Sequence, residues 1–255
     1  MPISVLSKDD FRPRPHDAAA ERLARKVPVA ADIFKKLHPA AKQRAFALAQ
    51  VHKARLLQQA QHIIERTLRH GRPVRDAVDE ILKAFDVAGV PRPAAGRLRQ
   101  SIRGNLLTAY SQARREQMDR PHIRAAFPHR QKLTVGNGTP GVNGVRPSHA
   151  ALHGKVFRAD DTFWDHFSGN YDYGCRCFER SLTAGQAKAM RCVIWTYVGG
   201  AIVPAAEQLT GRPGKRQRQG VRARPNPDWA PDAIEFDLSA INAELRAALE
   251  ETLRK

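Results

Sequence analysis

Residues 97–118 read RLRQSIRGNLLTAYSQARREQM, and this stretch marks the point where the chain changes from regular helix to mixed structure. Its apolar residues recur every three or four positions, which places them on one face of an α-helix. They are Leu98, Ile102, Leu106, Ala109 and Ala113. Pro121 follows and ends this helical pattern, because proline does not continue a regular helix.

The sequence before this helix is expected to be helical as well. Residues 40–69 contain neither glycine nor proline, and their spaced apolar residues predict one amphipathic helix that ends at Gly71. A second helix is expected over 74–85, so that residues 41–120 form a helical bundle. Residues 1–40 are basic and contain several prolines, which predicts an arm with one short helix around 17–26.

The sequence after Pro121 is expected to be irregular. Residues 121–185 are rich in glycine and proline and contain short apolar pieces of strand length, which predicts a small α+β motif domain. A strand hairpin is expected to turn at Gly199-Gly200, within an extension over 186–210.

Residues 211–255 are expected to form a basic linker and a C-terminal helix. A cap at Asp237 or Ser239 would start this helix, and Ile241, Leu245, Leu249 and Leu253 would form its apolar stripe. The predicted fold class is therefore α+β, with an N-terminal helical bundle, a small irregular α+β motif domain, a basic linker and a C-terminal helix.

Composition points to a polyanionic partner. The chain has 255 residues, 43 Lys and Arg against 25 Asp and Glu, and a formal net charge of +18. Such an excess favours non-specific binding to DNA, although an arginine-rich, solubilising surface explains it equally well. Residues 211–227 hold the densest cluster and contain no acid, so they are the candidate DNA contacts. Their cations are Arg212, Lys215, Arg216, Arg218, Arg222 and Arg224.

Other features of the sequence argue against a membrane or a secreted protein. No apolar run approaches the roughly 20 residues of a membrane-spanning helix, and the polar N-terminus does not resemble a signal peptide. The chain has three cysteines, clustered between 175 and 192, which does not suggest a disulfide scaffold. We therefore expect reduced thiols and no membrane partner.

The residues best suited to chemistry lie between 146 and 177. His149 and His153 are four residues apart, which suits one face of a helix, and Cys175 and Cys177 are two apart, which suits one side of a strand. Two histidines and two cysteines match the ligands of tetrahedral zinc, so a structural zinc site is one interpretation. In the other, the histidines hold a turn by hydrogen bonds and the cysteines are small buried apolar groups.

A catalytic role is not expected. A Cys–His pair or a His–Arg pair could serve nucleophilic or acid–base chemistry, but no further residue specifies either role. The phosphate-binding G-x4-G-K-[ST] loop, G-x-G-x-x-G and H-E-x-x-H are all missing. Aromatic residues of this region are expected to form the core of a small domain rather than a stacking surface for bases. They are Phe157, Phe163, Trp164, Phe167, Tyr171 and Tyr173.

Several short motifs, in this order and spacing, resemble the phage Mu F-like head morphogenesis family. They are GNLLTAYSQAR (104–114), TVGNG (134–138), RPSHAALHG (146–154), DDTFW (160–164) and NYDYGCRC (170–177). The resemblance covers 41–180 well, with RAFALAQ (44–50) upstream and a weaker match at PNPDWAPDA (225–233). Departures are Ala113 in place of glycine, an insertion over 138–145, and Phe167-Ser168-Gly169 in place of two prolines.

The resemblance implies a minor protein of the procapsid that assembles in the bacterial cytoplasm and ends in the virion. It implies portal, scaffold or major capsid proteins as partners and contact with packaged DNA, and it does not establish a reaction. The alternative is a nucleic-acid-acting effector or nuclease-like domain stabilised by zinc. The positions that the resemblance marks as motif or structural residues are Asn105, Thr108, Tyr110, Arg114, Arg146, Ser148, His149, His153, Gly154, Asp161 and Trp164.

Overall fold

A computed structural model describes residues 16–135, 144–209, 221–222 and 238–255. The chain divides into two compact units, which are described separately. The first runs to Ala113 and includes Glu235–Lys255, and the second is Arg114–Ile234. The expected α+β class is confirmed, with helices in the first unit and a mixed sheet in the second.

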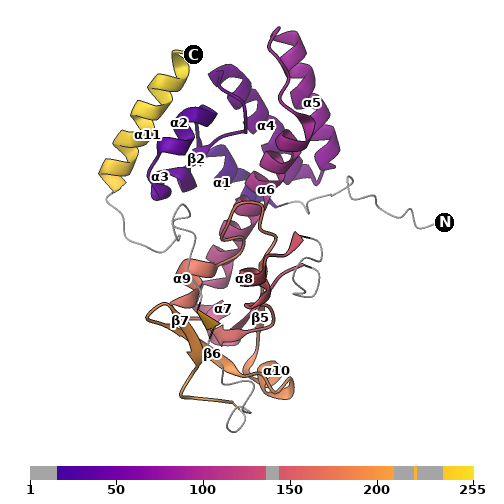
Figure 1. The fold of residues 1–255 in the computed structure, drawn as a ribbon. Coiled ribbons are helices and arrows are strands. Elements are labelled where there is room, and N and C mark those ends of the chain that lie inside the picture. Colours follow the sequence, from indigo (N-terminus) through magenta and orange to yellow (C-terminus); the bar gives the residue numbers. More distant parts are fainter. Residues whose placement is uncertain (1–15, 136–143, 210–220, 223–237) are drawn as a thin grey trace, which may run out of the picture. The chain divides into compact units, whose positions relative to one another are not determined.

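The first unit is a helical unit that joins both ends of the described chain (Figure 1). Its helices are α1 (Asp17–Ala24), α2 (Ala31–Lys36), α3 (Pro39–Arg44), α4 (Ala54–His70), α5 (Val74–Val87), most of α6 (Ala95–Met118) and α11 (Leu238–Leu253). Apolar faces of α1, α4, α5 and α6 share one core, as their spacing predicts. Gly71, with φ of 61°, closes α4 in the left-handed conformation, and Pro73 precedes the first residue of α5.

The single helix predicted over 40–69 is wrong. The segment breaks after α3 into β2 (Ala45–Phe46), which pairs in parallel with β1 (Val27–Pro28), and helix resumes only at Ala54. Tertiary hydrogen bonds explain the break. The Asn105 side chain donates to the Ala47 carbonyl at 3.1 Å, and the Ala49 N–H donates to the Ser101 hydroxyl at 3.1 Å. These partners on α6 satisfy backbone groups that a helix would otherwise use.

The prediction of an arm over 1–40 is wrong for residues 16–40, which are part of the packed first unit. The predicted short helix is present as α1, and its Ala19, Ala20 and Leu23 are fully buried in the core of the first unit. Gln61 of α4 donates from its amide to the carbonyls of Leu23 and Lys26, both at 2.8 Å, and so holds the end of α1.

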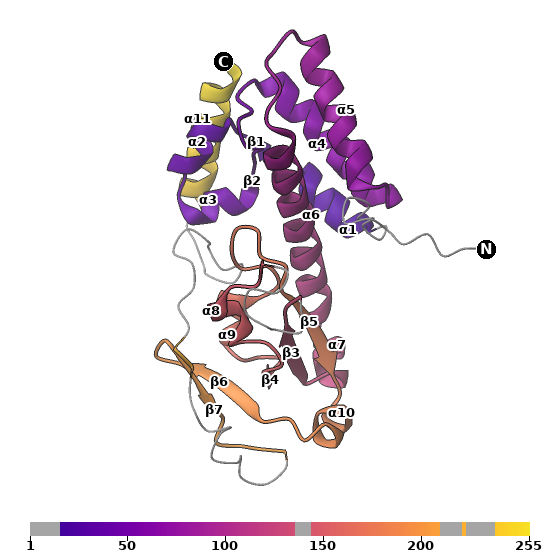
Figure 2. The ribbon, with the colours of Figure 1, turned by 45° about the vertical axis from the view of Figure 1, so that its right-hand side comes forward.

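The C-terminal helix also packs differently from its predicted stripe. Helix α11 contacts α2, α3 and β1 in the first unit (Figure 2). Ile241, Leu245, Ala248 and Thr252 are its buried residues, whereas Leu253 is 58% exposed. The buried face follows the spacing i, i+4, i+7, i+11, which matches 3.6 residues per turn over this length better than steps of four.

The second unit is built on a six-stranded mixed sheet in the order β5-β3-β4-β6-β7-β8 (Figure 2). Its strands are β3 (His129–Leu133), β4 (Val156–Arg158), β5 (Phe178–Leu182), β6 (Ile194–Val198), β7 (Ala201–Pro204) and β8 (Val221–Arg222). Its short helices are α7 (Pro121–Ala126), α8 (Pro147–Ala150), α9 (Phe163–Phe167) and α10 (Ala184–Ala189). All pairings are antiparallel except the parallel pair β4–β6.

The two faces of this sheet carry different cores. Val156 pairs with Ile194 and Phe157 with Trp195, so successive residues point to opposite faces. Val156 and Ile194 join a small cluster with α10, while Phe157 and Trp195 join the aromatic core. That core includes Phe163, Trp164, Phe167 and Tyr171 as predicted, but Tyr173 is 49% exposed and is not part of it.

The predicted hairpin is confirmed, although it is not a separate extension. Strands β6 and β7 pair antiparallel through a turn at Gly199 and Gly200, whose φ angles of 57° and 80° suit a two-residue turn. Since β6 also pairs with β4, the hairpin belongs to the main sheet.

Some sequence predictions fall outside the described residues. Arg212, Lys215, Arg216, Arg218 and Arg224 of the basic segment, the GNG of the glycine-rich motif, the PNPDWAPDA element and the cap at Asp237 lie there. The backbone of Arg222 lies in β8, where it pairs with Ala201. Among the described helices, none is both long and apolar enough to cross a membrane.

Thr252→Val tests the placement of α11. The buried Thr252 hydroxyl accepts the Ala30 N–H at 3.0 Å and donates to the Ala248 carbonyl at 2.7 Å. Valine has nearly the same shape but leaves that buried N–H without an acceptor, so we expect about 1–3 kcal/mol less stability on chemical denaturation. Leu253→Ala is the control and should change stability little. Equal effects of the two substitutions would contradict this packing of α11.

Candidate functional site

Strand β3 reads HRQKL, and its first four residues are buried despite being polar or charged. It lies between β5 and β4, so its backbone is paired on both sides. Buried polar side chains must find partners, because an unpaired one costs several kcal/mol (about 2–7 for an uncharged group, more for a charge). The partners found by this strand determine how the rest of the second unit is positioned.

Lys132 has no solvent exposure, and its ammonium group donates to two backbone carbonyls. The acceptors are Phe167 and Gly169, the latter at 2.6 Å. The ammonium also lies 4.8 Å from the centre of the Tyr171 ring, a cation–π distance. Lys132 therefore fixes the chain as it leaves α9.

Arg130 fixes the end of α6, and Glu179 fixes the segment after α9 that Lys132 also holds. Arg130 is 1% exposed and donates to the Met118 carbonyl at 3.0 Å and to Asp119 at 2.6 Å. Glu179, on the neighbouring strand β5, accepts the Ser168 hydroxyl at 2.7 Å and the Gly169 N–H. The chain over 167–169 is thus held both by a cation and by a carboxylate.

Arg115 makes a further buried link within the second unit. It is 9% exposed and donates to the Trp164 carbonyl at 2.6 Å and to the Asp165 carboxylate at 3.0 Å. It thereby joins the last turn of α6 to α9. Sequence reasoning missed Arg115, Arg130, Lys132 and Glu179, because charged residues in a short polar segment give no local sign of burial.

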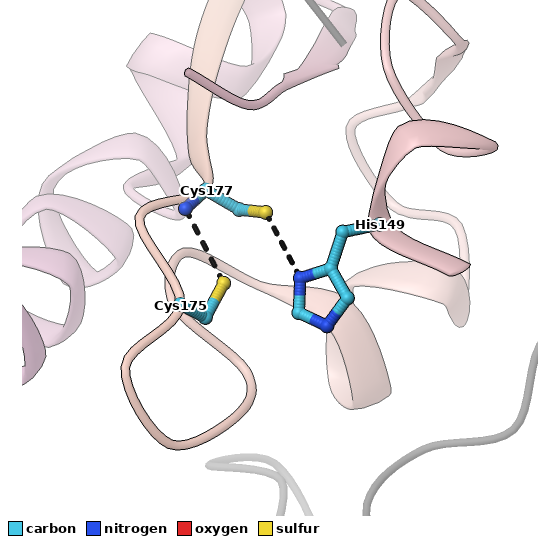
Figure 3. A group of neighbouring side chains, drawn as sticks. All are labelled: His149, Cys175 and Cys177. Carbon is cyan, nitrogen blue, oxygen red and sulfur yellow. Dashed lines mark hydrogen bonds between the residues drawn. The ribbon is translucent and has the colours of Figure 1, made fainter. Parts of the chain in front are cut away.

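Beside this network, His149, Cys175 and Cys177 form a compact group of metal-ligand type (Figure 3). The nearest ligand atoms of the three side chains lie within 4.8 Å of one another, and each residue is 5% exposed. His149 lies on α8, which Pro147 begins at its first position, and the cysteines end the loop that precedes β5. His149 Nδ1 lies 3.4 Å from Cys177 Sγ, and the Cys177 N–H donates to Cys175 Sγ at 3.3 Å.

The imidazole of His149 is held in place on its other sides. Its Nε2 lies 3.4 Å from a carboxylate oxygen of Asp172, which also forms an ion pair with Arg146. The Tyr171 ring stacks on it with centroids 4.5 Å apart and planes 18° from parallel. One ring nitrogen therefore faces the sulfurs and the other faces a carboxylate.

The two buried thiols share protons unequally. The pKa of Cys177 is lowered, first because the Cys175 thiol donates a hydrogen bond to it and then because His149 does. The pKa of Cys175 is raised, because its proton is held in the hydrogen bond to Cys177 and because burial disfavours a second thiolate. The two thiols therefore titrate as a linked pair and not independently.

His153, which the sequence placed in the same zinc site, is not in this group. Its Nδ1 accepts the Thr134 N–H at 3.1 Å, so the ring serves to hold the chain after β3. Gly154 beside it has a φ of 79° and its N–H donates to the Lys132 carbonyl at 2.7 Å. The four-ligand set is therefore corrected to His149, Cys175 and Cys177.

The remaining motif residues have structural contacts. Asp161 accepts the Phe163 N–H at 2.8 Å at the start of α9, and the Trp164 indole N–H donates to the Arg158 carbonyl at 2.7 Å. On the other unit, Asn105 holds the 45–53 segment through Ala47. Of the other motif residues, Thr108 is buried, whereas Ser148 and Arg114 are exposed. Tyr110 contacts His16 edge to face, with ring centroids 5.2 Å apart.

Two kinds of chemistry fit the His149 group. Cys177, His149 and Asp172 lie in the order of a nucleophile, a base and a carboxylate that orients the base. A substrate would have to reach the sulfur, however, and Cys177 is only 5% exposed. Metal binding has no such requirement, and two sulfurs with one imidazole nitrogen are a ligand set that zinc accepts.

Thiol labelling tests the burial of this group. Cys192 is partly exposed, whereas Cys175 and Cys177 are buried. We expect iodoacetamide to modify Cys192 in the folded protein at least about tenfold faster than the other two, and all three cysteines to react in denaturant. Peptide mass spectrometry identifies the site, and Cys192→Ser should remove the native-state signal. Rapid modification of Cys177 would instead show an accessible thiolate and favour a nucleophile.

Comparison with known proteins gives the family. A sequence model described as phage Mu protein F like protein matches residues 25–179, which include most of the first unit's helices and the whole His149 group. The "Mu-like prophage FluMu F protein" of Haemophilus influenzae is 31% identical over 153 residues, covering 55% of this chain and 35% of that protein. The "Putative capsid assembly protein F" of Escherichia phage Mu is 37% identical over 87 residues, covering 34% of this chain and 18% of that protein.

The chain thus spans about a third or less of the length of these two relatives. No solved structure matches it. The family match covers more than half of the chain and agrees with the motifs between 104 and 177. This chain belongs to the phage Mu protein F like family.

Proposed function

We propose that this chain is a minor head protein that acts in phage head morphogenesis, as a component of the procapsid and then of the virion. The observation that carries the proposal is membership of the Mu F like family, together with the name of the phage Mu relative, a capsid assembly protein. The fold adds support of a physical kind. The His149 group is buried, so a substrate has no direct access to its sulfurs in the part of the chain that the structure describes.

A surface for a head-protein partner is suggested by the edge of the sheet. Strand β5 is the first strand in the sheet order, and its Phe178 is 44% exposed. Arg180, two residues along on the same face, contacts the sulfur of Met190, which is 47% exposed. In the first unit, by contrast, the apolar faces of α1, α4, α5 and α6 are buried in its core, and Val87 and Leu253 are exposed singly. We therefore assign the contact with a portal, scaffold or major capsid protein to Phe178 and Met190.

Particle association tests this assignment. The chain is co-expressed with the portal, scaffold and major capsid genes of the phage that encodes it, and procapsids are isolated by sedimentation. Wild-type protein should sediment with the particles. The double substitution Phe178→Ser and Met190→Ser should lower its amount at least about tenfold, since exposed apolar anchors of an interface are each worth about 1–2 kcal/mol.

Val87→Ser is the matched control, because Val87 is 91% exposed and lies in the first unit. It should leave association unchanged. If wild-type protein is absent from the particles, the head-protein proposal fails. If all three proteins associate equally, only the assignment to Phe178 and Met190 fails.

We further propose contact with packaged DNA through the basic segment 211–227. The support is its six cations without an acid and the net charge of +18. Each phosphate neutralised by a cation releases counterions, so the affinity of such a segment falls steeply with salt. Placement near the portal would bring these cations to the path of the DNA.

DNA binding is measured on duplex DNA over a range of salt concentrations. Changing Arg212, Lys215, Arg216 and Arg218 to Ser should weaken binding and reduce the log–log salt slope by up to about 3.6, or about 0.9 per lost phosphate contact. The charge-matched control changes four exposed cations of the first unit to Ser: Lys35, Lys36, Arg55 and Lys83. Equal losses in the two variants would mean that overall charge, and not this segment, binds DNA.

A further inference from the structure

We propose that His149, Cys175 and Cys177 bind one zinc ion, which fixes the end of the loop 168–177 to helix α8. The ion would have a structural role in the second unit. The proposal stands apart from the proposed function, because it depends only on the geometry of these residues and their neighbours.

The spacing of the ligand atoms is that of a zinc site. With Zn–S of about 2.3 Å and Zn–N of about 2.0 Å, a tetrahedral ion places sulfur and nitrogen about 3.5 Å apart. His149 Nδ1 and Cys177 Sγ are 3.4 Å apart, and the Cys175 sulfur lies within 4.8 Å of both. Small shifts would bring the three atoms to the spacing of ligands of one ion.

The surroundings of His149 are those of a metal-binding histidine. Such a histidine binds the metal with one nitrogen and donates from the other to a carboxylate or carbonyl, which fixes the ring. Here Nδ1 faces the sulfurs, and Nε2 faces the Asp172 carboxylate at 3.4 Å. The stacked ring of Tyr171 fixes the plane of the imidazole. This arrangement matters for metal binding, whereas a histidine that merely fills space needs no such orientation.

The ion would add a further attachment near the end of the loop. Residues 168–177 contain neither helix nor strand. Lys132 and Glu179 hold the beginning of the loop at Phe167, Ser168 and Gly169. The end of the loop is held by the contacts of Arg146 with Asp172 and Tyr173, by one N–H···S hydrogen bond and by the entry of the chain into β5. A zinc ion would add three bonds to these contacts.

Ligand softness and burial select the metal and its role. Thiolate ligands favour zinc over magnesium or calcium, which prefer oxygen. The described residues supply three ligands from His, Cys, Asp and Glu, so a water molecule would complete the tetrahedron. An open position commonly serves catalysis, but here each ligand residue is 5% exposed and a substrate has no direct access. The ion therefore acts as a staple between α8 and the loop.

The test is the metal content of the full chain, purified without a His tag and without added metal. Elemental analysis should find about one zinc per chain. After removal with a chelator, cobalt should restore binding and produce the thiolate-to-metal charge-transfer absorption and intense visible bands of a tetrahedral site with sulfur ligands. Cys175→Ser, Cys177→Ser and His149→Ala should each lower the zinc content at least about tenfold.

Two control variants separate this site from general effects. Cys192→Ser removes the third thiol, and His153→Ala removes the histidine that lies outside the group; both should keep the zinc. Circular dichroism identifies any variant that fails to fold, and the cobalt spectrum of the wild type then decides. A folded wild type that contains no zinc and gives no cobalt spectrum would overturn the proposal. So would zinc lost equally in His153→Ala, or a disulfide between Cys175 and Cys177 found by mass spectrometry in freshly purified protein.

Discussion

The second unit depends on a strand that buries two cations. Lys132 and Arg130 lie on β3, in the interior of the sheet, where water cannot solvate them. An unpaired charge there would be prohibitively costly, so the chain around the strand must supply acceptors. It does so with backbone carbonyls at Met118, Phe167 and Gly169 and with the carboxylate of Asp119. The positions of the segments that carry these acceptors are therefore restricted to those within hydrogen-bond distance of Arg130 and Lys132.

Several other features follow from this constraint. Because Phe167 and Gly169 are held by Lys132, α9 is fixed against the sheet, and its Phe163 stacks on Phe157 with ring centroids 3.7 Å apart. Because α9 is fixed, the loop after it places Tyr171 over His149. The aromatic core and the His149 group are therefore successive consequences of the same buried strand. Apolar burial supplies much of the stability, while the polar contacts decide which arrangement is adopted.

The sequence predicted those elements that local chemistry determines. Helices α4, α5 and α6 follow from apolar periodicity, and the β6–β7 hairpin follows from two glycines. Prediction from the sequence failed where contacts with residues distant in the chain determine the local structure. Asn105 and Ser101 break the helix expected through Ala47 and Ala49, a contact across more than 50 positions. At the site, spacing identified three members of the group but wrongly added His153, since H-x3-H spacing suggests a shared helix face and α8 ends at Ala150.

The same buried strand explains why a metal in this unit would act locally. Small zinc domains unfold without metal because they have little other core. Here the aromatic core and the contacts of Lys132 and Glu179 hold the beginning of the loop by themselves. Loss of the ion would remove its three bonds, while His149 keeps its contacts with Asp172 and Tyr171 and the sheet and α9 keep their partners. Metal binding would then add to the order of the segment from Asp172 to Cys177, which adjoins the exposed Phe178 at the edge of the sheet. A local staple at that edge would stiffen the surface available to a partner without determining the fold.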